Sequence, residues 1–395
     1  MLKATRQGTK DHNSRLILNT IYHQGDISRA DIARKTGLTR PTVSSIVAEL
    51  IEDRLVIETG LGPSAGGKPP TLLNISENAF QCICADLGNQ EFRGAVVNLR
   101  GEIIQRFNIP IDDQNGELAL ECVYTLVDNL LSLADSPILG IGIGTPGLMD
   151  AQRGVVRNAV NLDWSNLPLG KLLEDRYDLP VYIANDCQAA ALGEFTFGES
   201  ENSKNMIVIK IGRGIGAGIV INGQLYYGDN FGAGEIGHVV VADNGERCRC
   251  GNYGCLETIV SSRAIIQNAQ VLFTQDPSSQ LHQYVSSPDQ INIEVVNKAY
   301  LSGDKAIQLL IDEAGDYLGK AISNLVSTLN IQHIVIAGDF THLSPAFEKD
   351  VRQELNKGTL PALANETHIE TSRLGADIVI LGAAALLLQN ELGIT

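Results

Sequence analysis

The sequence predicts an α/β protein in which an N-terminal winged helix-turn-helix module precedes a larger body built from two similar α/β halves. Two observations predict this fold class. Helix caps, glycine turns and apolar stripes recur at short intervals over the first 75 residues. Beyond them, two stretches repeat the same succession of short strands and tight turns. We therefore expect three domains: 1–75, with a linker and wing at 60–75, then 76–200 and 201–395.

Three helices are expected in the module. Ser14 caps the first, which ends before Gly25 at about residue 24. Ser28 caps the second, which runs through residue 36, and Gly37 supplies the turn. Thr39 caps the third, which runs to about residue 51. Two helices joined by a glycine turn form a helix-turn-helix, whose second helix lies in the major groove of DNA.

The third helix has an apolar and a polar face. Its inward stripe has helical spacing and consists of Val43, Ile46, Val47 and Leu50. Short polar side chains and one arginine point outward near its start, and these are the predicted DNA contacts: Arg40, Thr42, Ser44 and Ser45. Ser and Thr reach bases or phosphates, and Arg can do either. The alternative is a three-helix interaction domain with no role in DNA binding.

A wing is predicted after the third helix. Residues 55–59 and 71–75 have the composition of two strands, and the Gly/Pro-rich loop 60–70 between them carries Gly66, Gly67 and Lys68. We expect these three residues to approach the DNA backbone. The loop also marks the boundary of the module, which is tethered closely to the body.

Composition places the protein in a reducing compartment. The chain has 395 residues, 44% of them hydrophobic and 19% charged, and no uninterrupted apolar run reaches about 18 residues. Its first residues lack the apolar region of a secretory signal. Seven cysteines, three of them clustered, fit a metal site better than a disulfide framework. We expect a cytoplasmic protein without a membrane span.

Charge is distributed unevenly along the chain. The net charge is −16, yet residues 1–75 carry 10 Lys and Arg against 7 Asp and Glu, which makes them +3 and the remainder −19. A locally basic module can bind DNA although the body is acidic, with an affinity that depends on salt.

The body contains two similar β-meanders, at 81–104 and 205–227. The first turns at 86–89 and at 100–101, and the second at 212–214 and at 222–223. Helices at 117–134, 305–329 and 375–389 and a strand at 138–143 are expected as well. The glycine array of the second meander, Gly212, Gly214, Gly216 and Gly218, leads into a strand and lacks G-x-G-x-x-G spacing, so a Rossmann fingerprint is rejected. A tight hairpin and a phosphate cradle explain it equally well.

Segment 234–257 combines metal ligands with carboxylates. Three cysteines, Cys248, Cys250 and Cys255, follow His238 within a short stretch. Thiolates and an imidazole suit tetrahedral Zn²⁺, and four protein ligands leave no position for an activated water, so the zinc would be structural. The alternative is three reduced cysteines in a glycine-rich loop.

Several motifs of the body together resemble the ROK family of bacterial sugar kinases and sugar-responsive repressors. They are GIGTPGLMD (142–150), NAVNLDW (158–164), LPVYIANDCQAAALGE (179–194), IGRGIGAGIVINGQLYYG (211–228), GAGEIGH (232–238) and CRCGNYGCLE (248–257). Segment 27–56 likewise resembles bacterial winged helix-turn-helix repressors. The resemblance implies an actin-like, hexokinase-like body of two α/β lobes.

A sugar pocket is implied by this resemblance. The family's sugar-binding positions correspond here to Asn185, Asp186, Glu235, His238 and Glu257, and less directly to Asn161 and Gly147. Carboxylates and an amide pair with the hydroxyls of a hexose in specific orientations. In the family's kinases the residue matching Asp186 is the general base. Capping of the helix that follows also explains Asp186.

The phosphate-handling positions depart from the kinase pattern. The family's kinases have Gly-Gly-Thr where this chain has Gly88-Asn89-Gln90, Gly-Thr-Gly where it has Gly212-Arg213-Gly214, and consecutive glycines near Gly338-Asp339-Phe340. Because phosphoryl transfer depends on positioning, the bulky Gln90 and Arg213 there predict a protein that is not an enzyme. The alternative is that Arg213 itself binds phosphate. We expect a repressor that binds operator DNA as a homodimer or dimer of dimers and responds to a small sugar. The alternatives are an active sugar kinase that also binds DNA and a repressor controlled by a protein partner.

Overall fold

A computed structural model describes all residues except 1–5, 64–68, 89, 112–113, 199–202, 340–344 and 395. By its internal contacts the chain divides into two units, one of residues 1–185 and 380–395 and the other of residues 186–379. Each unit is described by itself. The expected division into three domains stays a prediction.

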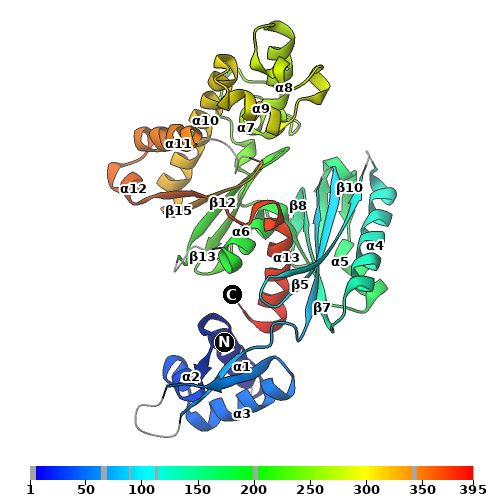
Figure 1. The fold of residues 1–395 in the computed structure, drawn as a ribbon, viewed down its shortest axis with the longest axis vertical. Coiled ribbons are helices and arrows are strands. Elements are labelled where there is room, and N and C mark those ends of the chain that lie inside the picture. Colours follow the sequence, from blue (N-terminus) through cyan, green and yellow to red (C-terminus); the bar gives the residue numbers. More distant parts are fainter. Residues whose placement is uncertain are drawn as a thin grey trace. The chain divides into compact units, whose positions relative to one another are not determined.

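The winged module has three helices and a three-stranded sheet (Figure 1). Its elements are α1 (Arg6–Gln24), β1 (Ile27–Ser28), α2 (Arg29–Thr36), α3 (Arg40–Glu52), β2 (Val56–Leu61) and β3 (Thr71–Ile75). The sheet order is β1-β3-β2, and both pairings are antiparallel. Strand β1 was not expected, because two residues are too short to show a periodic pattern.

The predicted boundaries of α2 and α3 and the predicted end of α1 at Gln24 are confirmed, whereas the predicted start of α1 is wrong. The side chains of Ser28 and Thr39 accept hydrogen bonds from backbone N–H groups in the first turns of α2 and α3. Gly37 has a φ of 71° and ends α2. Helix α1 begins at Arg6, so Ser14 lies inside it. Residues 6–13 are polar and carry no apolar stripe, which is why the sequence pattern started only near Ser14.

The module has its own apolar core. Helices and strands each contribute side chains with no exposed surface, among them Ile17, Ile21, Ile32, Val43, Val47 and Leu73. The stripe predicted for α3 is buried in full. The module is therefore held together by apolar contacts.

The first unit continues with a five-stranded sheet of order β11-β7-β4-β5-β6. Its strands are β4 (Gln81–Leu87), β5 (Glu91–Asn98), β6 (Ile103–Pro110), β7 (Ile138–Thr145) and β11 (Val181–Asn185). Helices α4 (Gly116–Leu133) and α5 (Leu169–Tyr177) and a small sheet of β8 (Leu148–Asp150), β9 (Val155–Ala159) and β10 (Trp164–Leu167) complete this part. Asp86 and Leu87 lie in β4, so the turn begins two residues later than expected.

The second unit contains a five-stranded sheet of order β14-β13-β12-β15-β16. Its strands are β12 (Met206–Ile211), β13 (Ile215–Ile221), β14 (Gln224–Leu225), β15 (His333–Gly338) and β16 (His368–Thr371). Its helices include α6 (Asp186–Phe197), α7 (Glu257–Val260), α8 (Ser262–Gln275), α9 (Ile293–Leu301), α10 (Lys305–Leu329), α11 (Pro345–Gly358) and α12 (Pro361–Glu366). The expected helix at 375–389 is η6 (Gly375–Asp377), α13 (Ile378–Leu387) and η7 (Leu388–Leu392), and α13 crosses into the first unit.

The two sheets share one topology. In each, a meander of three antiparallel strands leads into two parallel strands added beside its first strand. The duplicated architecture predicted from the two similar stretches is therefore confirmed.

Glycines in the sheets let a helix approach closely. A Cβ atom at Gly218 of β13 would clash with the carbonyl of Cys187 on α6, and one at Gly142 of β7 would clash with the backbone of Ala383 on α13. Figure 1 shows α13, in red, against the sheet that contains β5 and β7. Close helix packing therefore explains Gly218, an alternative to hairpin and phosphate cradle that the sequence did not suggest.

One helical stretch among the described residues, Gly375–Leu392, is long and apolar enough to cross a membrane by length and composition, and 61% of it is buried inside the structure. A core helix of a soluble protein passes the same test.

Candidate functional site

Four potential metal ligands meet in the second unit. The ligand atoms of His238, Cys248, Cys250 and Cys255 all lie within 4.8 Å of one another. The Sγ atoms of Cys250 and Cys255 are 3.6 Å apart, and Sγ of Cys248 lies 3.6 Å from Nδ1 of His238. With Zn–S bonds of about 2.3 Å, two sulfurs of a tetrahedral site lie about 3.8 Å apart. The cluster therefore has ligand types, and in these two pairs a spacing, that are compatible with a Zn²⁺ site.

The loop that carries the cysteines folds through tight turns. The backbone N–H of Cys248 donates to the carbonyl of Asn252 at 2.7 Å, and the N–H of Cys250 donates to Sγ of Cys248 at 3.5 Å. Gly254 has a φ of 69°, and a Cβ atom there would clash with the carbonyl of Ala242. Only glycine fits this position without strain, and it brings Cys255 back to the other two cysteines.

The thiols of the cluster differ in their electrostatic surroundings. Burial, followed by a hydrogen bond to Glu257, raises the pKa of Cys248. The backbone N–H of Asn252 lowers the pKa of the exposed Cys250. A metal ion binds thiolates, so binding here releases protons.

A carboxylate approaches each ring nitrogen of His238. Its Nε2 lies 3.9 Å from Oε2 of Glu235, and its Nδ1 lies 3.6 Å from Oε1 of Glu257. Sγ of Cys248 donates to the same Glu257 oxygen at 2.9 Å. One ring nitrogen thus faces the cysteines while the other faces Glu235, as expected for a histidine that joins a metal to a polar pocket.

Three carboxylates of the predicted sugar pocket act on one another. Burial raises the pKa of Glu235, and the negative charges of Asp186 and Glu257 raise it further, while His238 lowers it. These four side chains of the second unit therefore share one polar site. Oriented acceptors at such a site suit the hydroxyls of a sugar.

Asp186 has a cationic partner. Nζ of Lys210 on β12 lies 2.7 Å from Oδ2 of Asp186, and each side chain is about one fifth exposed. The backbone N–H of Cys187 donates to the other carboxylate oxygen at 3.0 Å, and α6 begins at Asp186 itself, so capping by Asp186 stays a prediction. Lys210 was not predicted from the sequence. A single lysine inside the otherwise apolar strand MIVIKI was the signal that could have revealed it.

Two of the remaining predicted sugar-binding residues meet in the first unit. Nδ2 of Asn185, at the end of β11, donates to the carbonyl of Gly147 at 2.9 Å. Gly147 has a φ of 92°, and a Cβ atom there would clash with the carbonyl of Asn158. Asn161 is exposed in the 3₁₀ helix η1 (Val160–Leu162). The joining of these residues with those of the second unit into one pocket stays a prediction.

The predicted DNA contacts lie at the start of α3. Arg40, Ser44 and Ser45 are exposed. Thr42 is half-buried, and its Oγ1 lies 2.8 Å from Oγ1 of Thr39, so it also helps to cap the helix. Gly66, Gly67 and Lys68 of the wing lie outside the described residues.

Comparison with known proteins decides the family. The ROK family profile matches residues 82–390, and a winged helix-turn-helix DNA-binding profile matches residues 10–57. The chain belongs to the ROK family.

Repressors and kinases both occur among its relatives. The xylose repressor of Caldicellulosiruptor bescii is 33% identical over 390 residues, which are 97% of this chain and 97% of the relative. The glucokinase of Halalkalibacterium halodurans is 34% identical over 311 residues, which are 78% of this chain and 94% of the relative. A ROK family transcriptional regulator, described as a homologue of the E. coli MLC protein, matches with a TM-score of 0.86, 28% identity and 98% coverage of both chains. The predicted winged module and actin-like, hexokinase-like body are thereby confirmed.

Two of the phosphate-handling positions of this ROK chain lie together at one end of the second sheet. The turn between β12 and β13 closes with a hydrogen bond from the N–H of Gly212 to the carbonyl of Gly214, at 2.9 Å, and Arg213 is exposed there. A Cβ atom at Gly212 would lie 3.9 Å from Oδ2 of Asp339. Asn89 and Phe340 lie outside the described residues. A carboxylate beside the turn would repel the phosphates of a nucleotide placed there, whereas the exposed Arg213 would attract them.

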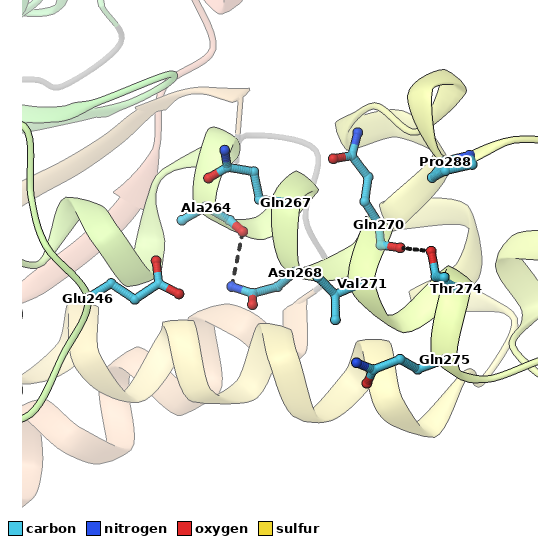
Figure 2. A pocket seen from close by; sticks show the side chains of 9 residues that line it. All are labelled: Glu246, Ala264, Gln267, Asn268, Gln270, Val271, Thr274, Gln275 and Pro288. Atoms are coloured by element: carbon cyan, nitrogen blue, oxygen red, sulfur yellow. Dashed lines mark hydrogen bonds between the residues drawn. The ribbon is translucent and has the colours of Figure 1, made fainter.

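A hollow of about 650 Å³ lies elsewhere, along α8 (Figure 2). Four of its nine lining residues carry side-chain amides, and none of the nine is a predicted sugar-binding residue. Nδ2 of Asn268 and Oγ1 of Thr274 both donate to carbonyls of their own helix, at 3.1 and 2.9 Å. These groups do not converge on a ligand, so the carboxylates near His238 remain the candidate site.

Proposed function

We propose that this ROK protein is a sugar-responsive transcriptional repressor whose body senses the sugar and whose winged module binds operator DNA. The observation that carries this proposal is the match to a xylose repressor over 97% of both chains, winged module included. Support comes from the exposed polar residues at the start of α3 and from the carboxylates near His238. The class of sugar recognised by that relative makes aldoses the first effectors to test.

A sugar would bind through Asn185, Asp186, Glu235, His238 and Glu257, with Asn161 and Gly147 as further candidate ligands. Zn²⁺ held by His238 and the three cysteines would fix the loop that presents His238 and Glu257. It would act as a structural ion, because its four protein ligands leave no open position. Loss of one paired hydroxyl from the sugar would cost about 1 to 3 kcal/mol.

Sugar binding would change the placement of the two winged modules of a homodimer on their half-sites. Two-fold protein symmetry then matches a palindromic operator. A coupling of about 1 to 3 kcal/mol between the two sites corresponds to a roughly 5- to 150-fold change in operator affinity. A repressor of this kind acts in the cytoplasm.

Operator binding in the presence of sugars tests this function. A duplex is selected by the full-length protein from random DNA, and its dissociation constant is measured with and without xylose, glucose, fructose and N-acetylglucosamine. Release of the duplex by one of them is expected. Failure of every sugar, combined with relief of binding by cell extract, would instead favour control by a protein partner.

The second candidate function is an ATP-dependent sugar kinase that also binds DNA. The glucokinase relative, 34% identical over 311 residues, is the observation that favours it. The ion pair of Lys210 with Asp186, the residue that matches the general base of the family's kinases, and the position of Asp339 beside the Gly212 turn argue against it. We propose that the chain is not an enzyme. Sugar-dependent ATP consumption that disappears in Asp186→Ala would overturn this assignment.

A further inference from the structure

A turn of the body contacts the winged module through one arginine. Arg100 lies between β5 and β6, and its Nη1 donates to the backbone carbonyl of Tyr22 at 2.7 Å. Its Nη2 donates to Oδ1 of Asn74 at 2.8 Å. Its Cζ also lies 4.4 Å from the centroid of the Tyr22 ring. A single half-buried guanidinium therefore contacts both α1 and β3 of the module.

The position of Tyr22 explains why an arginine suits this place. Tyr22 lies in the last turn of α1, where backbone carbonyls have no partner within the helix and the helix dipole favours a cation. The ring is 5% exposed, and burial raises the pKa of its hydroxyl to about 12. A planar guanidinium can donate to a carbonyl and lie over an aromatic face together, which an ammonium group does less well.

The turn that carries Arg100 is itself held in place. Asn98 is fully buried, and its Oδ1 accepts hydrogen bonds from the backbone N–H groups of Arg100, at 2.9 Å, and Glu102, at 3.0 Å. The N–H of Leu99 donates to the carbonyl of Glu77 at 3.0 Å. These hydrogen bonds fix the backbone of Arg100 relative to strands β5 and β6.

Hydrogen bonds continue from Arg100 toward the wing. Nδ2 of Asn74 donates to Oδ1 of Asp26 at 3.4 Å, and Oγ1 of Thr59 donates to the same oxygen at 2.7 Å. Thr59 lies in β2, the strand that leads into the wing loop. Four side chains thus connect a turn of the body to the base of the wing.

A second contact holds the middle of α1. Nη2 of Arg15 donates to the carbonyl of Asn390 at 3.1 Å, close to the C-terminus. The neighbouring Glu391 accepts a hydrogen bond from the hydroxyl of Tyr182 at 2.6 Å. Tyr182 lies in β11, which ends at Asn185, a predicted sugar-binding residue. The C-terminal segment therefore links the strand of Asn185 to α1.

We propose that Arg100 is a positioning residue that fixes the orientation of the winged module on the body, with Arg15 as a second hold on α1. The sugar dependence of operator binding then passes through these two contacts, an inference that rests on the proposed function. Arg100 belongs to neither the predicted DNA contacts nor the predicted sugar-binding residues. It determines whether a change in the body reaches the wing.

The experiment measures operator affinity with and without sugar for full-length variants. The probes are the selected duplex and the sugar that releases it from the unmodified protein. In Arg100→Ala the ratio of the two affinities should fall at least about fivefold, toward an uncoupled module. Arg100→Lys keeps the positive charge but loses the two-pronged guanidinium. Its affinity ratio should lie between those of the unmodified protein and Arg100→Ala. Thr59→Val, which removes only the bond to Asp26, should lower the ratio less.

Lys171→Ala is the matched control. It removes one positive charge from α5 of the same unit, where the side chain is 73% exposed and its ion pair with Asp175 spans 3.9 Å. The ratio should not change in this variant. An unchanged ratio in Arg100→Ala would overturn the proposal, and so would an equal loss of affinity with and without sugar, which indicates a structural role only.

Hydrogen exchange separates failure of this inference from failure of the proposed function. If no sugar changes operator binding by the unmodified protein, the proposed function fails. The contact is still tested, because Arg100→Ala should speed amide exchange about tenfold at residues 22–26 and 71–75, where local opening becomes easier. Unchanged exchange at these residues would overturn the role of Arg100.

Discussion

The winged module and the cysteine-rich loop are both short segments with a well-defined fold, but they are held together by different forces. The module buries a continuous set of apolar side chains, including Ile17, Val47 and Leu73, with no exposed surface. The segment from Asp243 to Tyr253 is mostly exposed, and in it Cys248 is buried. A buried aliphatic side chain contributes about 1.5 to 3 kcal/mol, whereas the loop depends on thiolate–metal bonds. Metal removal should therefore reduce the sugar response, and mutation of the module's core should abolish operator binding.

The largest expected effect is on the module. Val47→Asp places a carboxylate in a site with no exposed surface and should destabilise the module by more than about 4 kcal/mol. Operator binding should be lost while zinc content stays the same. Thermal unfolding by circular dichroism and metal analysis measure the two outcomes. Ala48→Asp, at the exposed next position, is the control for stability, and similar unfolding in both variants would contradict the assigned core.

The second largest effect is expected in the loop. Cys248→Ser removes a ligand that lies 3.6 Å from Nδ1 of His238, so the protein should bind less zinc. The sugar response should fall by more than about tenfold, because the contacts that orient His238 and Glu257 are lost. Operator binding without sugar should change little. A normal sugar response in zinc-free protein would break the link between this loop and sensing.

A smaller effect is expected on the DNA-binding face. Arg40→Ala removes an exposed cation at the start of α3 and should weaken operator binding by about 1 to 3 kcal/mol if Arg40 contacts a base. Gel-shift titration at fixed salt measures the loss. The ratio of operator affinities without and with sugar should stay the same. Arg34→Ala, at an exposed position of α2, is the charge-matched control. Equal affinity of the Arg40 variant and the unmodified protein would point to another contact surface.

Local features of the fold could be predicted from the sequence, and long-range ones could not. Ser28 and Thr39 were correctly placed as caps because a cap depends on neighbours three residues away. The four metal ligands lie within 18 residues and were found together for the same reason. Two contacts join residues that are far apart in the chain, and no local sequence pattern predicts them. They are the ion pair of Lys210 with Asp186 and the hydrogen bonds of Arg100 with Tyr22 and Asn74.

The smallest expected effect is on stability, and substitutions of Ser14 and Ser28 test whether a local sequence pattern identifies a helix cap. Both serines matched the cap pattern, but Ser28 caps α2, with its Oγ 3.2 Å from the N–H of Asp31, whereas Ser14 lies inside α1. Ser28→Ala should therefore destabilise the module by about 1 kcal/mol. Ser14→Ala should be neutral or stabilise it by about 0.5 kcal/mol, because alanine is the better residue within a helix. Chemical denaturation of the two variants measures both changes, and equal destabilisation would mean that α1 begins at Ser14 in solution.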